Sequence, residues 1–90
     1  MELKQFLRAA TMHERGEVAG LCNNSVAYLY QLAGGHRFAS ALLAIQIERK
    51  TQQVAAGTKG RLKAVPRESL VRHPEIFAAR EGPMDADPLR

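Results

Sequence analysis

Apolar residues recur at helical spacing through the first half of the chain, and no alternation of period two persists anywhere. Residues 2–10 form the first such segment, with apolar side chains three or four positions apart, which predicts an amphipathic helix. Thr11 and Glu14 then have the spacing of a capping box, which predicts the start of a second helix. That helix should end at Asn23 and Asn24, because asparagine tolerates the left-handed conformation that ends helices.

Two further helices are predicted, each preceded by a serine. Ser25 and Ser40 are good N-caps for helices over residues 26–33 and 41–50, and a glycine pair after the third helix stops it. The positions of the four helices expected to face inward are Leu3, Phe6, Leu7, Ala10, Val18, Ala19, Cys22, Val26, Leu29, Leu32, Ala33, Leu42, Leu43, Ala44 and Ile47.

The helical pattern weakens after residue 50. Residues 51–64 contain two glycines and little periodicity, which predicts a linker or a linker with one helical turn. Pro66 suits the first turn of a fifth short helix that runs to about Arg72. Residues 78–90 are polar, contain proline and lack aromatic side chains, so a disordered tail is predicted there.

The length and composition fit one small all-α domain. Ninety residues, 46% hydrophobic and 24% charged, can form one modest core. We expect a compact bundle of about five short helices over residues 1–77, with residues 52–64 as a flexible basic connection. Apolar residues of the closing segment, such as Phe77, need burial. They can fold back on the other helices or pack across a dimer axis, and the long connection favours the dimer.

Charge and cysteine content narrow the class of protein. The net charge is +4, and residues 49–72 hold seven basic side chains against one acidic, which suggests a polyanion partner or a solvated basic face. The lone Cys22 excludes an internal disulfide framework, so a reducing cytoplasmic compartment is expected, with the protein associated with the nucleoid. The longest uncharged apolar stretch, residues 38–47, is far shorter than the ~20 residues that span a bilayer, so no membrane contact is expected.

The second and third predicted helices have the spacing of a helix-turn-helix motif. A three-residue turn joins them, Ala19 is small where the two helices would cross, and Asn23 accepts a positive φ in the turn. A generic helical hairpin explains the same spacing almost as well.

The chain also resembles a known family. The residues that carry the resemblance are Ala19, Ser25, Gly35, Arg37, Ser40, Leu43, Ala44, Ile47, Glu48 and Thr51, and then Val65, Pro66, Arg67, Leu70, Pro74, Glu75, Ile76 and Phe77. The chain is thereby similar to the Cro-type helix-turn-helix domains of phage and prophage regulators, which have a lambda-repressor-like fold, and in particular to the YdaS-like antitoxin group. Asn23 and Asn24 depart from the glycine and the aliphatic residue usual in that family.

The resemblance implies that the third helix enters the DNA major groove. The base contacts it implies are Ser25, Val26, Ala27, Tyr30 and Gln31. Gln31 can pair with adenine, and Val26 and Ala27 can touch a thymine methyl. The helix carries no lysine or arginine, so readout should favour A·T pairs. Core packing is the alternative for Val26, and a place on the amphipathic rim is the alternative for Tyr30.

Phosphate contacts are implied for residues around that helix. They are Arg15, Asn24, His36, Arg37, Lys59, Arg61 and Lys63. An exposed loop histidine with no DNA role is the alternative for His36. Lys59, Arg61 and Lys63 form either an arm on the DNA backbone or a flexible solubilising loop.

Other chemistries find little support in the sequence. His13, His36 and His73 lack metal-ligand spacing, and Cys22 lies on an inward face, as a structural thiol does. The glycines at 57 and 60 do not have the spacing of a P-loop. We therefore expect neither an enzyme nor a metal nor another cofactor.

The sequence thus predicts a sequence-specific DNA-binding transcriptional regulator, a Cro-like repressor that occupies its operator on double-stranded DNA as a homodimer. The alternative is a protein-interaction module, such as an antitoxin that binds a cognate toxin or another regulator, with DNA contact secondary. A third possibility is a nonspecific nucleic-acid binder that uses only the basic segment.

Overall fold

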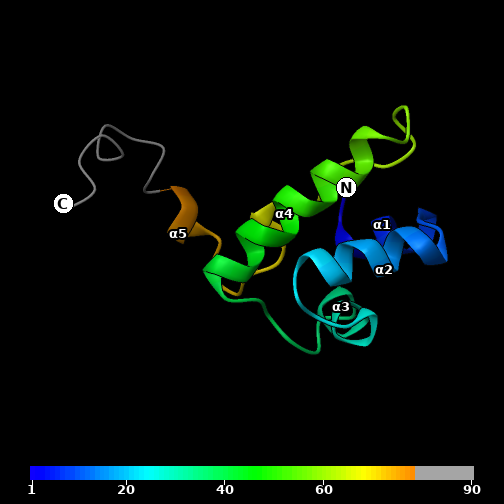
Figure 1. The fold of residues 1–90 in the computed structure, drawn as a ribbon. Helices are drawn as coiled ribbons and strands as arrows, with labels where there is room; N and C mark the ends of the chain where they lie inside the picture. Colours follow the sequence, from blue (N-terminus) through cyan, green and yellow to red (C-terminus); the bar gives the residue numbers. More distant parts are fainter. Residues whose placement is uncertain (79–90) are drawn as a thin grey trace.

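A computed structural model describes residues 1–78, and all regular structure within this range is helical. The elements are α1 (Leu3–Ala9), α2 (Met12–Leu21), α3 (Val26–Ala33), α4 (Ala41–Ala56), a 3-10 helix η1 (Arg67–Ser69) and α5 (Glu75–Ala78) (Figure 1). The predicted all-α class, with about five short helices, is confirmed for this part of the chain. Most of the predicted tail, residues 79–90, lies outside the described residues, whereas Ala78 ends α5 and does not begin a tail.

The predicted helix starts are confirmed by their hydrogen bonds. Thr11 Oγ1 accepts from the N–H of Glu14 at 3.1 Å, and Glu14 Oε1 accepts from the N–H of Thr11 at 2.8 Å. Ser25 and Ser40 each accept, at 3.1 Å, from the N–H three residues later. These bonds satisfy donors that the first turn of a helix leaves without an intrahelical partner.

The predicted helix ends depend on residues with a positive φ. Asn23 has a φ of 59° just after α2, and Gly35 has a φ of 79° just after α3. The turn around Asn23 brings α3 back against α2, while α1 also packs on α3. The four elements α1 to α4 then enclose one core, because α4 packs on α2.

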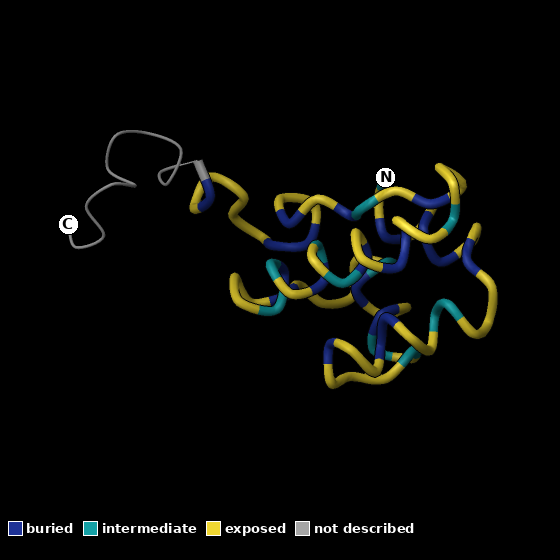
Figure 2. The backbone as a smooth tube through the Cα atoms, turned by 45° about the horizontal axis from the view of Figure 1, so that its top comes forward, coloured by how far each residue is buried: buried dark blue, intermediate teal, exposed yellow. Residues whose placement is uncertain are grey.

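The core consists of the inward faces of the helices and of the closing segment. Figure 2 shows buried and exposed stretches alternating along the chain, so each of the longer helices turns one side inward. The largest fully buried side chains are Phe6, Leu7, Val18, Leu29, Ile47, Thr51 and Val65. Leu42 is the clear exception among the expected inward positions, because its side chain is 67% exposed at the start of α4.

The predicted linker is wrong in its first part, because α4 continues to Ala56, six residues beyond the predicted end. The inward face of α4 runs on through Thr51, Val54 and Ala55, all buried. Thr51 can be buried because its hydroxyl donates to the carbonyl of Ile47 at 2.7 Å and accepts from the N–H of Val65 at 2.9 Å. Because its hydroxyl is hydrogen-bonded, Thr51 can continue the buried face of α4, although a polar residue at this position interrupts the apolar pattern in the sequence.

The closing segment also differs from the prediction. A 3-10 helix at Arg67–Ser69 takes the place of the expected helix to Arg72, and a further helix, α5, follows it. Phe77 is 4% exposed within a single chain, and the guanidinium of Arg67 lies 5.6 Å from the centroid of its ring. Of the two arrangements expected for Phe77, the structure therefore shows the fold-back within the chain, and the favoured dimer contact is not needed for its burial.

Candidate nucleic-acid interface

The outward face of α3 is open to solvent. Ser25, Ala27, Tyr30 and Gln31 are exposed, with Tyr30 at 49%. Val26 is half-buried and packs against the core, which agrees with the packing alternative for this residue. Four of the five predicted base-contact positions are therefore accessible, and the fifth packs against the core.

A side-chain hydrogen bond orients the C-terminal half of this face. Arg37 Nε donates to Gln31 Oε1 at 2.7 Å. An amide oxygen has two lone pairs, so Gln31 keeps an acceptor site and both N–H donors for a base edge. Arg37 keeps its remaining N–H donors, so the same residue can orient Gln31 and bind a phosphate.

Arg15 is held by the end of α1. Its Nη1 donates to the carbonyl oxygens of Leu7 at 2.9 Å and Ala10 at 3.1 Å. These carbonyls lie at the C-terminal end of α1, where a helix has no N–H donor of its own for them. The side chain is half-buried, and the bonds fix its guanidinium between α1, α2 and α3. Arg15 therefore has a structural function, and its other guanidinium nitrogens remain for an anion.

The two other predicted phosphate contacts near α3 lie at its ends. Asn24 is exposed and donates from Nδ2 to the carbonyl of Cys22 at 3.4 Å. His36 is exposed, and its ring lies close against Gly34. Both side chains reach solvent beside α3, so each can still meet a phosphate.

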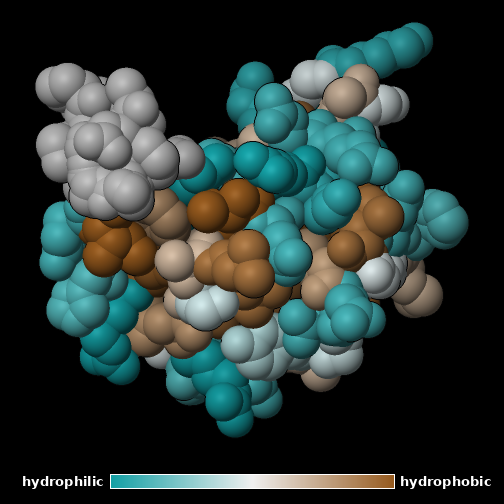
Figure 3. All heavy atoms as spheres, turned by 60° about the vertical axis from the view of Figure 1, so that its left-hand side comes forward, coloured by the Kyte–Doolittle hydropathy of each residue, from teal (hydrophilic) through white to brown (hydrophobic). Residues whose placement is uncertain are grey.

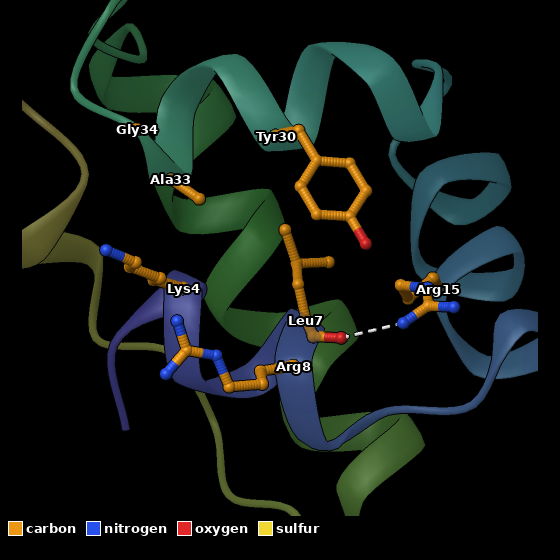
Figure 4. Close-up of a pocket in the computed structure, with 7 residues that line it drawn as sticks. All are labelled: Lys4, Leu7, Arg8, Arg15, Tyr30, Ala33 and Gly34. Carbon is orange, nitrogen blue, oxygen red and sulfur yellow. Dashed lines mark hydrogen bonds between the residues drawn. The ribbon is translucent and has the colours of Figure 1, made fainter.

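A groove of about 450 Å³ runs between α1 and α3 (Figure 4). It is lined by Lys4, Leu7, Arg8, Arg15, Tyr30, Ala33 and Gly34. Figure 4 shows the Tyr30 ring above Leu7, with its hydroxyl pointing toward Arg15. Three cationic side chains and no carboxylate line this groove, which makes it a positively charged site.

Lys4 and Arg8 were absent from the predicted site. Both are exposed on α1, and neither has an ion-pair partner among residues 1–78. Their spacing of four residues was a visible signal, because it places two like charges on one face of the first predicted helix. Their relation to Tyr30 was not visible, since it depends on how α1 packs on α3.

Lys59, Arg61 and Lys63 lie apart from α3. In Figure 1 the turn that follows α4 and helix α3 lie on opposite sides of α1 and α2. Arg61 donates to the carbonyl of Ala9 at 2.8 Å and forms an ion pair with Glu14, so it fastens this turn to the body. The basic segment is therefore folded onto the protein around Arg61, which corrects the expected flexible connection over residues 52–64.

Other members of the basic segment are also used internally. Arg67 forms a largely buried ion pair with Glu48 of α4, and Arg72 stacks on Phe38 with its guanidinium carbon 4.6 Å from the ring centroid. Fewer cations between residues 49 and 72 are therefore free to bind a polyanion than their number in the sequence suggests.

Metal and thiol chemistry find little support in the described part of the chain. Residues 1–78 hold no group of three or more histidine, cysteine or acidic side chains that could bind a metal. Cys22 is buried, and this burial raises the pKa of its thiol, which disfavours the nucleophilic thiolate. No helix among the same residues has the length and apolar character needed to cross a membrane.

Comparison with protein-family models, with curated proteins and with solved structures gives no match to this chain. The resemblance to Cro-type regulators therefore stays a prediction.

Proposed function

We propose that the protein is a DNA-binding transcriptional regulator in which α2 and α3 act as a helix-turn-helix. The observation that supports this most is the open face of α3, which carries Tyr30 and Gln31 and is bordered by Arg15 and Arg37. An uncovered helix face with hydrogen-bonding side chains between cations has the composition needed to enter a major groove.

The proposed readout is weak and favours A·T pairs. Gln31 pairs with the N6 and N7 edge of adenine, and Ala27 contacts a thymine methyl. The face of α3 offers no arginine for guanine, so the common arginine contact is missing from the body of this helix. Arg15 and Arg37 bind phosphates and set the register of α3 without reading sequence.

A homodimer on a pseudo-palindromic operator would double this limited contact. Phe38, Leu42 and Ile76 are 46%, 67% and 48% exposed, and they belong to the segment before α4, to α4 itself and to α5. Figure 3, which brings this side of the molecule forward, shows hydrophobic residues gathered on it. We propose this surface as the dimer contact.

The same surface favours a second candidate function, a protein-interaction module that binds a cognate toxin or another regulator. Sedimentation of Leu42→Glu separates the two functions. A shift from dimer to monomer supports the regulator, whereas a wild-type protein that is monomeric and does not bind DNA favours the interaction module.

The proposed function is tested by selecting bound duplexes from a random pool and measuring their affinity by fluorescence anisotropy at fixed salt. Gln31→Ala should weaken binding to the selected duplex by ~1–3 kcal/mol and leave random duplexes almost unchanged. Gln53→Ala is the matched control, because Gln53 is exposed on α4 and lies outside the proposed interface. Absence of any selected sequence, or equal weakening on both duplexes, would contradict the proposal.

A further inference from the structure

We infer that the groove between α1 and α3 binds phosphates of the DNA strand that passes beside α3, through Lys4 and Arg8. The inference rests on the proposed function and adds a contact surface on α1 to it. The ligand chemistry is that of consecutive phosphodiesters, which match a row of cations.

The position of Lys4 is unfavourable for the stability of α1. It lies in the first turn of α1, which carries no acidic residue, and the positive end of the helix dipole disfavours a cation there. Arg8 follows four residues later on the same face, and like charges at this spacing destabilise a helix. Arg8 lies in the last turn, where the dipole favours it, so the dipole accounts for Arg8 and not for Lys4.

The packing of α1 on α3 adds a third cation to this pair. Arg15 is held at the groove by its bonds to Leu7 and Ala10, and no carboxylate lines the groove. Lys4, Arg8 and Arg15 therefore form a row of positive charge with no compensating acid in it. A polyanion that crosses the groove removes this repulsion and releases its own counterions.

Tyr30 links the groove to the proposed reading face. It projects from α3 over Leu7, and its hydroxyl points toward Arg15 (Figure 4). A phenol can donate to a phosphate oxygen, so Tyr30 and Arg15 can hold a phosphate at one end of the row. A DNA strand bound there can continue along α1 toward Arg8 and Lys4, whereas a single phosphate ion cannot extend along the groove.

The test compares two double variants that remove the same charge. Lys4→Gln with Arg8→Gln alters the groove, whereas Lys59→Gln with Lys63→Gln alters the turn on the other side of α1 and α2. All four side chains are exposed, and thermal melting by circular dichroism checks that both variants fold. The measured quantity is the slope of log K against log salt for a selected duplex.

We expect the groove variant to lower the slope by about two, because each lost phosphate contact releases ~0.9 fewer counterions. Near 0.1 M salt, this corresponds to roughly tenfold weaker binding for each removed contact. The Lys59 and Lys63 variant should keep the wild-type slope. Equal slopes for wild type and groove variant would overturn the inference and leave DNA binding through α3 intact. A wild-type protein that binds no duplex would instead overturn the proposed function, and the DNA assignment of the groove with it.

Titration with inorganic pyrophosphate, followed by amide chemical shifts, distinguishes the two sources of phosphate. Weak shifts near Lys4, Arg8 and Tyr30, together with the lowered salt slope, support the DNA strand. Saturable pyrophosphate binding in the groove with an unchanged salt slope would assign the groove to a free phosphorylated ligand and overturn the DNA assignment.

Discussion

Single residues control how α2 and α3 meet. Asn23 adopts a φ of 59°, which asparagine reaches more easily than most residues, and this turn lets the backbone N–H of Asn24 bond to the carbonyl of Ala19 at 2.9 Å. Ala19 is 3% exposed, so its methyl group fills the space between α2 and the rest of the core. The angle of α3, and with it the aim of Gln31, depends on these small side chains.

Ala19→Leu should lower the free energy of unfolding by ~1–3 kcal/mol, because three added carbon atoms overpack a closed core. Gly16→Ala is the control on the same helix, since a Cβ at Gly16 would meet nothing within 4 Å. That variant should gain up to about 1 kcal/mol from helix propensity. Urea unfolding measures both, and an Ala19→Leu protein as stable as wild type would show that this position has room to spare.

At the scale of elements, α4 joins the N-terminal helices to the closing segment. Its length depends on Thr51, whose hydroxyl bonds to α4 on one side and to the N–H of Val65 on the other. The ion pair between Glu48 and Arg67 lies one turn earlier and fixes η1 on the same helix. Two polar contacts from one side of α4 therefore position the chain from Val65 to Phe77.

Thr51→Val should cost ~1–3 kcal/mol of stability, because the isosteric side chain leaves the buried N–H of Val65 without its acceptor. Thr51→Ser keeps the hydroxyl and should retain most of the wild-type stability. Chemical unfolding compares the three proteins. A valine variant as stable as wild type, with the loss confined to the serine variant, would mean that the methyl group, and not the hydrogen bond, is what matters at this position.

At the scale of the whole molecule, internal ion pairs hold some of the cations, and the others stay unpaired. Glu14 holds Arg61, and Glu48 holds Arg67, so these acids neutralise cations far from α3. Lys4, Arg8, Arg15 and Arg37 have no such carboxylate partner among residues 1–78. Unpaired cations therefore lie around α1 and α3 as well as in the basic segment, where Arg49, Lys50, Lys59 and Lys63 have no ion pair among residues 1–78 either.

Acid should weaken the attachment of the turn after α4. The hydrogen bond from the Thr11 backbone, followed by Arg61, holds the pKa of Glu14 below its ordinary value. A lowered pKa in the folded state adds stability above the ordinary carboxylate pKa, and this stability is lost as pH falls through the lowered value. Glu14→Gln should therefore be less stable than wild type at pH 7, and the difference should shrink toward pH 3.

Urea unfolding at several pH values measures this difference. Glu17→Gln is the control, because Glu17 is an exposed acid of α2 outside these ion pairs. A gap between wild type and Glu14→Gln that stays constant with pH would show that the charge of Glu14 contributes no stability.

The sequence by itself determined where the first four helices begin and where the second and third end. The caps at Thr11, Ser25 and Ser40 and the turns at Asn23 and Gly35 follow from contacts within about four residues, which a local pattern contains. The exposed face of α3 was predictable for the same reason, since the helical repeat of 3.6 residues assigns each position to one side of the helix. Local chemistry therefore indicated both the helices and the candidate reading surface.

Tertiary structure alone decided which charges remain available on the surface. Arg61 reaches Glu14 across 47 residues, and Arg67 reaches Glu48 across 19, so no local pattern shows that these cations are paired. The end of α4 and the burial of Phe77 likewise depend on segments that meet only after folding. Packing of α1 on α3 places Lys4 and Arg8 in the same groove as Tyr30, because contacts between helices depend on their arrangement in space and not on their order along the chain.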